Sequence, residues 1–298
     1  MNFNLISMVT VPHFLDDNIF DTILPQIEEK QSLVYIDLKN TGFIDPYGMI
    51  GLLQIGRFLN SVGVKPILCL PESKDVLNYL KRMDFFKFTD SIFTIESHSY
   101  STIRSVGYSD VLLEITSIEK SDDIHAIVDK VMERAHTILT THLNYDENAI
   151  HNFVVALSEV CQNIIEHSQT TGLVGIQKYY FQKILGKNVV KIAVMDLGIG
   201  FKISLSKRFS SIYGKGWTDI KALEQALLHG ASRYEDMGRG HGLAAVKRFV
   251  EKWNGKLSIR SGTAKISIIP SWDTFGKSKQ TNLLFFSGTQ IGIILPAL

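Results

Sequence analysis

Cysteine is scarce in this chain, since only Cys69 and Cys161 occur in 298 residues. Both lie in apolar stretches, and they are far apart along the sequence. We therefore expect two buried thiols rather than a disulfide, which is typical of a protein in a reducing compartment.

A strong net charge and long apolar runs are absent as well. The formal net charge is +1, so we expect no global electrostatic attraction to nucleic acid or to a membrane surface. No apolar run approaches the roughly 20 residues that a membrane helix needs. The N-terminal sequence MNFNLI does not place a basic segment before a long apolar core, as a signal peptide would. A cytoplasmic protein is expected.

The composition is that of a globular protein, with 45% hydrophobic and 20% charged residues. The chain is long enough for one large domain or two ordinary ones. Its first hundred residues alternate strand and helix patterns. Strands are expected at residues 33–38 and 64–70, one helix from Tyr47 onward, and a second over residues 76–83. This βαβα order predicts a sheet covered on one face by helices.

A serine-rich stretch at residues 97–107 is the expected boundary between a domain at residues 1–100 and another at residues 108–298. A serine-rich surface loop would have the same composition. The second part opens with a strand and a long amphipathic helix, and further strands and helices follow. The expected helices span residues 124–142, 146–168 and 243–253; the expected strands span residues 111–116, 173–181, 189–195, 256–260, 265–269, 282–286 and 290–295.

The first motif that carries chemistry lies on the helix at residues 146–168. Glu159, Asn163 and His167 are four residues apart, so they share a face opposite the apolar stripe. The carbonyl oxygen of Asn163 is a suitable hard ligand for Mg²⁺, which takes few protein ligands. Glu159, one turn earlier, is placed to accept a proton from a water or hydroxyl that attacks a γ-phosphate. A solvated helix face has the same spacing and remains an alternative.

The second motif is Asp196-Leu-Gly198-Ile-Gly200, at the end of an apolar strand. A carboxylate there can accept a hydrogen bond from an exocyclic amino group, such as that of adenine. Gly198 and Gly200 allow the backbone to turn and to approach a base closely. An ordinary Asp-Gly turn needs no ligand and is the alternative.

The third motif, Gly238-Arg-Gly240-His-Gly242-Leu, opens a helix. Glycines at a helix start leave backbone N–H groups free to face a phosphate, which the helix dipole also favours. The spacing does not fit a dinucleotide fingerprint, because the third glycine comes too early. A plain loop is the alternative for this segment alone.

Together, in this order and with these strand and helix contexts, the three segments resemble the GHKL ATPase superfamily. Its members include histidine kinases, anti-sigma kinases, heat-shock chaperone ATPases and mismatch-repair ATPases. The resemblance covers roughly residues 109–298 and implies a Bergerat-type α/β sandwich with a mixed sheet. It implies ATP and Mg²⁺ as cofactors, with Asn163 on the metal, Asp196 on adenine, and Thr289 near adenine. It also implies an ATP lid at residues 201–237, from which several basic side chains would neutralise phosphate.

Within that superfamily, the segment around Glu159 and Asn163 is most similar to the anti-sigma serine kinase branch. The segments YIDL at residues 35–38 and FIDPYG at residues 43–48 resemble a STAS domain of the anti-anti-sigma type. In that family a serine that the kinase phosphorylates follows the position of Asp45. Here Pro46 and Tyr47 stand instead, so the resemblance does not imply a simple phosphorylation switch.

These observations predict an ATP–Mg²⁺-binding signalling regulator in which a GHKL-type ATPase or anti-sigma-like serine/threonine kinase domain is coupled to a STAS-like domain. Glu159 is the expected catalytic base. The alternative is an ATP-driven conformational switch, or a nucleotide-sensing adaptor, that phosphorylates no protein. A regulatory protein partner is expected, a homodimer is left open, and neither nucleic acid nor membrane is an expected partner.

Overall fold

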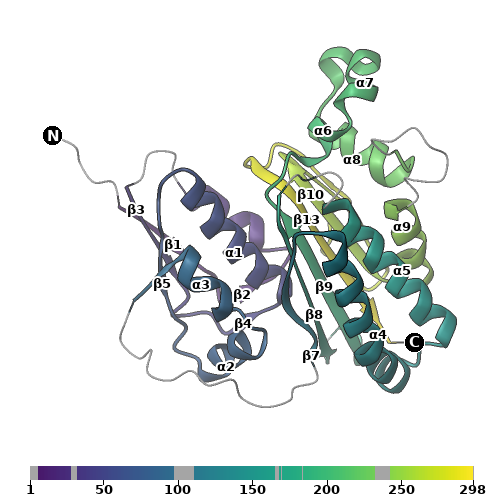
Figure 1. The fold of residues 1–298 in the computed structure, drawn as a ribbon, viewed down its shortest axis with the longest axis horizontal. Coiled ribbons are helices and arrows are strands. Elements are labelled where there is room, and N and C mark those ends of the chain that lie inside the picture. The colour runs from purple at the N-terminus through teal and green to yellow at the C-terminus, as the bar shows by residue number, and fades with distance from the viewer. Residues whose placement is uncertain are drawn as a thin grey trace.

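The computed structural model describes residues 6–27, 32–96, 111–164, 168, 170–182, 184–231 and 242–297. They form three β-sheets, of four, seven and two strands, together with helices, which confirms the α/β class (Figure 1). Residues 6–95 build the smaller sheets and residues 111–296 build the seven-stranded sheet. We call these parts the N-terminal unit and the C-terminal unit. The predicted domain boundary at residues 97–107 lies outside the described residues.

The N-terminal unit contains a four-stranded parallel sheet. The strands and helices predicted between residues 33 and 83 are present, and the sequence patterns missed an edge strand on each side and one helix. In sheet order the strands are β1 (Ile6–Thr10), β3 (Leu33–Asp37), β5 (Ile67–Cys69) and β6 (Thr94–Ile95). The helices are α1 (Pro46–Ser61), α2 (Lys74–Arg82) and α3 (Phe86–Ile92), and the short elements are β2 (Phe14–Leu15), β4 (Phe43–Ile44), η1 (Phe20–Thr22) and η2 (Leu24–Gln26).

Helix α1 is the central element of this unit. Its N-terminus is capped by the Asp45 carboxylate, which accepts a hydrogen bond from the Gly48 N–H at 2.9 Å, and Pro46 occupies the first turn. All residues from Pro46 to Gly56 are buried, which is unusual for a helix in a small domain. The reason is that α1 lies between the two units and contacts β8, β9 and β13 of the larger sheet (Figure 1).

The C-terminal unit is built on a seven-stranded sheet whose neighbouring strands are all antiparallel. The parallel strand pairs therefore lie in the N-terminal unit and the antiparallel pairs of the large sheet lie in the C-terminal unit. The expectation of a mixed sheet in the ATPase domain is wrong in this detail. In sheet order the strands are β12 (Lys279–Gln280), β11 (Ala264–Ile268), β10 (Lys256–Gly262), β13 (Phe286–Pro296), β9 (Lys187–Asp196), β8 (Gly172–Phe181) and β7 (Val111–Ile118).

Helices cover one face of this sheet and the N-terminal unit covers the other (Figure 1). Strand β9 shows how the sequence divides between them, because successive side chains of a strand point to opposite faces. Ile192 and Val194 belong to the core beneath the helices, whereas Ala193 and Met195 belong to the core of the N-terminal unit. The covering helices are α4 (Ser121–Leu143), α5 (Glu147–Asn163), α8 (Asp219–Leu228) and α9 (Gly242–Lys252).

The strand predicted at residues 282–286 is wrong. Residues 281–285 are irregular, and β13 begins only at Phe286. Asn282 adopts a left-handed conformation with φ +58°, which a strand cannot accommodate. The backbone of this segment pairs elsewhere, since the Leu283 N–H donates to the Thr263 carbonyl and the Leu284 carbonyl accepts from the Arg260 guanidinium.

Both cysteines are buried and unpaired, as expected, and burial raises the pKa of each thiol to about 12. Among the helices of the described residues, none has the length and apolar character needed to cross a bilayer.

Buried ion pairs join the two units. The Lys191 ammonium of β9 donates to the Asp45 carboxylate at 2.8 Å, the Lys256 ammonium of β10 lies 3.0 Å from Asp17, and the Arg260 guanidinium donates to Asp21 at 2.6 Å. The exposed fractions of the Lys191 and Asp45 side chains are 7% and 3%. Burial alone would lower the pKa of Lys191, but the carboxylates of Asp45, Asp16 and Asp17 together outweigh burial and hold that pKa above its usual value.

We predict that Lys191→Met lowers the free energy of unfolding by about 3–5 kcal/mol, because it leaves the Asp45 charge buried without its partner. The double variant Lys191→Met/Asp45→Asn should recover a large part of this loss, since the asparagine amide removes the charge and keeps an oxygen that can cap α1. Urea unfolding of the full chain measures both values.

The exposed pair of Lys87 and Asp84 is the control. Lys87→Met should cost less than about 1 kcal/mol. Equal losses for Lys87→Met and Lys191→Met would contradict a stabilising role for the buried pairs.

Candidate functional site

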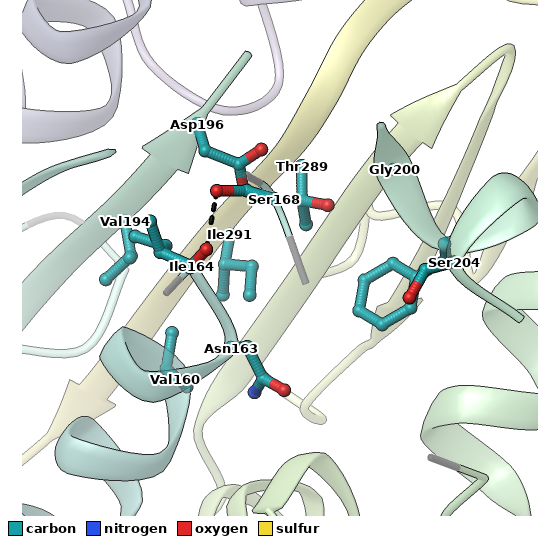
Figure 2. Close-up of a pocket in the computed structure, with 11 residues that line it drawn as sticks. Val160, Asn163, Ile164, Ser168, Val194, Asp196, Gly200, Ser204, Thr289 and Ile291 are labelled. Atoms are coloured by element: carbon teal, nitrogen blue, oxygen red, sulfur yellow. Dashed lines mark hydrogen bonds between the residues drawn. The ribbon is translucent and has the colours of Figure 1, made fainter. Parts of the chain in front are cut away.

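A pocket lies where the C-terminal end of α5 meets the ends of β9 and β13. Four predicted site residues line it together, namely Asn163, Asp196, Gly200 and Thr289 (Figure 2). They come from three separate parts of the sequence. The other lining residues are Val160, Ile164, Ser168, Val194, Phe201, Ser204 and Ile291.

Asn163 is the last residue of α5, whose start is fixed by the Asp146 carboxylate, an acceptor for the Ala149 N–H at 2.7 Å. The Asn163 side-chain N–H₂ donates to the Glu159 carbonyl at 2.8 Å. This bond orients the amide, so that its oxygen remains available on the pocket side, as Figure 2 shows. A carbonyl oxygen at this position fits Mg²⁺, which normally keeps several waters.

Within the described residues, no group of three or more His, Cys, Asp and Glu side chains is placed to hold a metal ion. If Mg²⁺ binds here with a nucleotide, Asn163 would supply one oxygen ligand beside phosphate oxygens and water. This arrangement agrees with the preference of Mg²⁺ for one or two protein ligands beside a nucleotide.

Glu159 lies one turn before Asn163 and is exposed, while Val160 and Cys161 next to it are buried. The predicted division of α5 into an apolar and a polar face is therefore confirmed for these residues. Glu159 does not line the pocket, and its role as a base stays a prediction. Helix α5 is described to Asn163, and His167 lies outside the described residues.

Asp196 is the last residue of β9, opposite Thr289 of β13, and its side chain is buried. One carboxylate oxygen accepts from the Gly198 N–H at 2.7 Å. Burial raises the pKa of Asp196 to about 7, and hydrogen bonds from the backbone N–H groups of Gly198 and Thr289 counteract part of that rise. Such a carboxylate gains from a ligand that donates a hydrogen bond to it, because the donor stabilises the buried charge.

Glycine is required at three positions around this carboxylate. A Cβ on Gly198 would lie 2.2 Å from the Ser168 carbonyl oxygen, and a Cβ on Gly288 would lie 2.1 Å from the Asp196 carbonyl oxygen. Gly200 and Gly288 also have positive φ angles, +69° and +76°. The backbones of the three segments therefore touch without intervening side chains.

Two serines that the sequence patterns missed hold these segments together. The Ser261 hydroxyl donates to the Gly288 carbonyl at 2.8 Å and accepts from the Phe201 N–H at 3.2 Å. The Ser287 hydroxyl lies 3.0 Å from both the Leu197 and the Gly198 carbonyls. Nothing in their spacing could have identified them, because their partners are distant in sequence.

Apolar side chains form the remaining wall of the pocket. Val160, Ile164, Val194, Phe201 and Ile291 surround the polar groups of Asn163, Asp196 and Thr289. The sequence patterns gave none of these side chains a part in the site except Phe201, which opens the predicted lid. An apolar slot with one buried acceptor suits a flat ring that carries an amino group.

The third motif is described only in part. Gly242 begins α9, as the helix prediction required, whereas Gly238 and Gly240 lie outside the described residues. The predicted lid at residues 201–237 contains more helix than expected. Its elements are α6 (Gly200–Ser204), α7 (Ser206–Tyr213), η4 (Gly214–Gly216) and α8.

The first part of this segment, α6 and α7, projects beyond the sheet (Figure 1). A stack of three aromatic rings stabilises it, since Trp217 lies 5.6 Å from Phe209 and 5.7 Å from Tyr213 between ring centroids. The basic side chains that were expected to neutralise phosphate are exposed and do not line the pocket: Lys202, Lys207, Arg208 and Lys215. Arg233 lies outside the described residues.

Comparison with known families identifies this part of the chain. Residues 149–293 match the model of the family described as histidine kinase-, DNA gyrase B-, and HSP90-like ATPase. They form a GHKL-type ATPase domain. A search of curated proteins finds no match.

The match begins two residues into α5 and ends within β13, so it contains the whole described pocket. At the level of the family, it supports ATP as the ligand of this ATPase domain. The polar residues that line the pocket fit such a ligand, since Asp196 offers a buried acceptor and Asn163 a carbonyl oxygen.

We predict that Gly288→Ala reduces ATP affinity at least tenfold, because the added Cβ would push the start of β13 away from Asp196. Calorimetric titration measures the affinity. Gly186→Ala is the matched control, because Gly186 also has a positive φ, +60°, but has open space around its Cα. It should lose about 1 kcal/mol of stability without a change in affinity. Unchanged ATP affinity in Gly288→Ala would show that the pocket does not require glycine at this position.

Asp196 also predicts a pH dependence of stability. Its pKa is near 7 when folded and near 3.9 when unfolded, so the folded state binds more protons between these values and becomes less stable as pH rises through them. Between pH 5 and pH 8, the free energy of unfolding of the unmodified protein should therefore fall by roughly 2 kcal/mol more than that of Asp196→Asn. Urea unfolding without nucleotide at both pH values tests this, and parallel pH profiles for the two proteins would contradict it.

Proposed function

We propose that the chain is an ATP–Mg²⁺-binding signalling regulator, in which the ATPase domain controls a protein partner and the N-terminal unit is its regulatory module. The observation that carries this proposal is the pocket that brings Asn163, Asp196, Gly200 and Thr289 together from three separate segments. The enzymatic form of the proposal is an anti-sigma-like serine/threonine kinase.

Each residue has a defined part in this mechanism. The Asp196 carboxylate accepts a hydrogen bond from the adenine amino group, and the apolar wall excludes water from the ring. The Asn163 carbonyl oxygen would hold Mg²⁺, which would supply positive charge to neutralise the phosphates. Glu159 accepts the proton of the attacking water or hydroxyl. Gly238, Gly240 and Gly242 offer backbone N–H groups to the phosphates.

The N-terminal unit is proposed to be STAS-like, but not a substrate of its own kinase. Asp45 and Tyr47 are 2% and 3% exposed, and Thr41 is 1% exposed. The segment lies against the ATPase sheet, where Asp45 pairs with Lys191 and the Tyr47 ring approaches Gly292. A hydroxyl in this position cannot reach a γ-phosphate unless the two units separate. The unit therefore resembles a built-in partner that is docked on the ATPase sheet.

One contact favours the alternative, an ATP-driven conformational switch or nucleotide-sensing adaptor. The Gln54 side chain on α1, which is completely buried, donates to the Met195 carbonyl at 3.0 Å. Met195 immediately precedes Asp196. Any movement of β9 on nucleotide binding would therefore reach α1 directly, and this route requires no phosphorylation.

Incubation of the purified chain with γ-labelled ATP, with and without a lysate of its source cells, distinguishes the two forms. Transfer of label to another protein supports the kinase, and release of labelled phosphate alone supports the switch. Bound nucleotide without either supports the adaptor. Failure to bind ATP at all would refute the proposal.

Variants of the site make this test sharper. Asp196→Asn should abolish ATP binding, because it replaces the acceptor charge in a buried position. Glu159→Ala should keep ATP affinity and reduce turnover by about 10²- to 10⁴-fold. Glu133→Ala, at an exposed position on α4, is the control and should change neither value. Full turnover in Glu159→Ala would exclude Glu159 as the base.

A further inference from the structure

A second cavity, of about 420 Å³, lies at the junction of the two units and is separate from the nucleotide pocket. Its lining includes Asp16 from the N-terminal unit, Lys191 and Ile294 from the sheet, and Trp272 and Phe275 from the segment after β11. The size is within the range of small-molecule sites, which bury most of a ligand of moderate size. None of its residues takes part in the proposed ATP chemistry.

Aromatic side chains form one side of this cavity. The rings of Phe181 and Trp272 meet edge to face with centroids 6.5 Å apart. Phe275 is 94% exposed at the rim, and Ile184 beside the cavity is 61% exposed. An aromatic ring so fully exposed has little part in the core of the protein, and exposed apolar side chains at a cavity commonly mark a binding site.

The aromatic wall is also held in place by hydrogen bonds. The Trp272 indole N–H donates to the Asn254 carbonyl at 2.7 Å. The Asp273 carboxylate accepts from the N–H groups of Phe275 and Gly276 at 3.2 and 2.9 Å. A preformed wall lowers the entropy lost when a ligand binds.

Among the described charged side chains that line the cavity, one carboxylate forms no ion pair. Lys256 is shared by two carboxylates, since its ammonium lies 3.0 Å from Asp17 and 3.1 Å from Asp273. Asp16 forms no ion pair within 4.0 Å among the described residues, although its charge contributes to holding the pKa of Lys191 above its usual value. One Asp16 oxygen accepts from the N–H groups of Asn18 and Ile19.

An anionic ligand would find no comparable partner here. The Lys191 ammonium is bound to Asp45 and lies 5.3–5.8 Å from the centroids of three aromatic rings. The Lys256 ammonium donates to Asn18 at 2.7 Å in addition to its two carboxylates. Both ammonium groups are therefore already paired with carboxylates of the protein.

From these observations we propose that the junction cavity binds a small organic cation, an amine or quaternary ammonium with an apolar body. The rings of Trp272 and Phe275 would contact its cationic carbons, and the Asp16 carboxylate would balance its charge. Since both units line the cavity, the ligand would bind only when they are docked together.

Calorimetric titration of the full chain with three probes that share one ring tests this proposal: benzyltrimethylammonium, benzyl alcohol and phenylacetate. The cation should bind at least about tenfold more tightly than the neutral and anionic probes. Equal affinity for all three, preference for phenylacetate, or no binding of the cation would each overturn the proposal.

Two variants locate the site. Asp16→Asn keeps the oxygen that accepts from Asn18 and Ile19 but removes the charge, and it should weaken binding of the cation about three- to tenfold. Phe275→Ala should weaken it by a similar factor. Asp122→Asn, at a carboxylate that is 82% exposed on α4, is the matched control and should have no effect. Unchanged affinity in both site variants would overturn the assignment even if the cation binds elsewhere.

Discussion

The structure depends on how the polar face of the seven-stranded sheet is neutralised. Lys191, Lys256, Arg260 and Lys265 project from this face, and each is at most 5% exposed. Buried cations are tolerated only when carboxylates and other acceptors surround them. The N-terminal unit supplies these groups through Asp17, Asp21 and Asp45. The sheet of the ATPase domain and the N-terminal unit are consequently two layers of one folded structure.

This arrangement places the nucleotide pocket and the N-terminal unit on opposite faces of the same strands. In β9, Val194 and Asp196 point toward α5 and the pocket, while Ala193 and Met195 point toward α1. The pocket is held by backbone contacts at glycines and by serine hydroxyls, which leave little freedom for independent movement. Helix α1 is therefore in direct contact with the strand that carries the proposed adenine acceptor, which is the geometry a nucleotide-dependent regulator requires.

Much of the fold and of the site could be predicted from the sequence, because local patterns determine local structure. Helix α5 begins where the sequence pattern placed it, with Asp146 as its cap, and its apolar stripe from Ala149 to Ile164 is buried. Asn163, Asp196, Gly200 and Thr289 were selected from short motifs, and they line one pocket. The segment at residues 282–286 was mistaken for a strand, because its apolar composition did not show the left-handed Asn282 or the backbone partners at Thr263 and Arg260. The contacts of Ser261 and Gln54 were invisible for a related reason, since their partners are 27 and 141 residues away.

The sequence by itself determined most of the helices and strands and which residues line the pocket, because periodicity, caps and glycine positions act over a few residues. It did not determine what covers the second face of the sheet. The alternation of Lys256, Ser258 and Arg260 with Leu257 and Ile259 is typical of a sheet with one solvated face. Only the tertiary structure shows that this polar face is buried, because the aspartates that neutralise it lie more than 140 residues earlier in the chain. The same docking created the cavity at the junction, which belongs to neither part of the sequence alone.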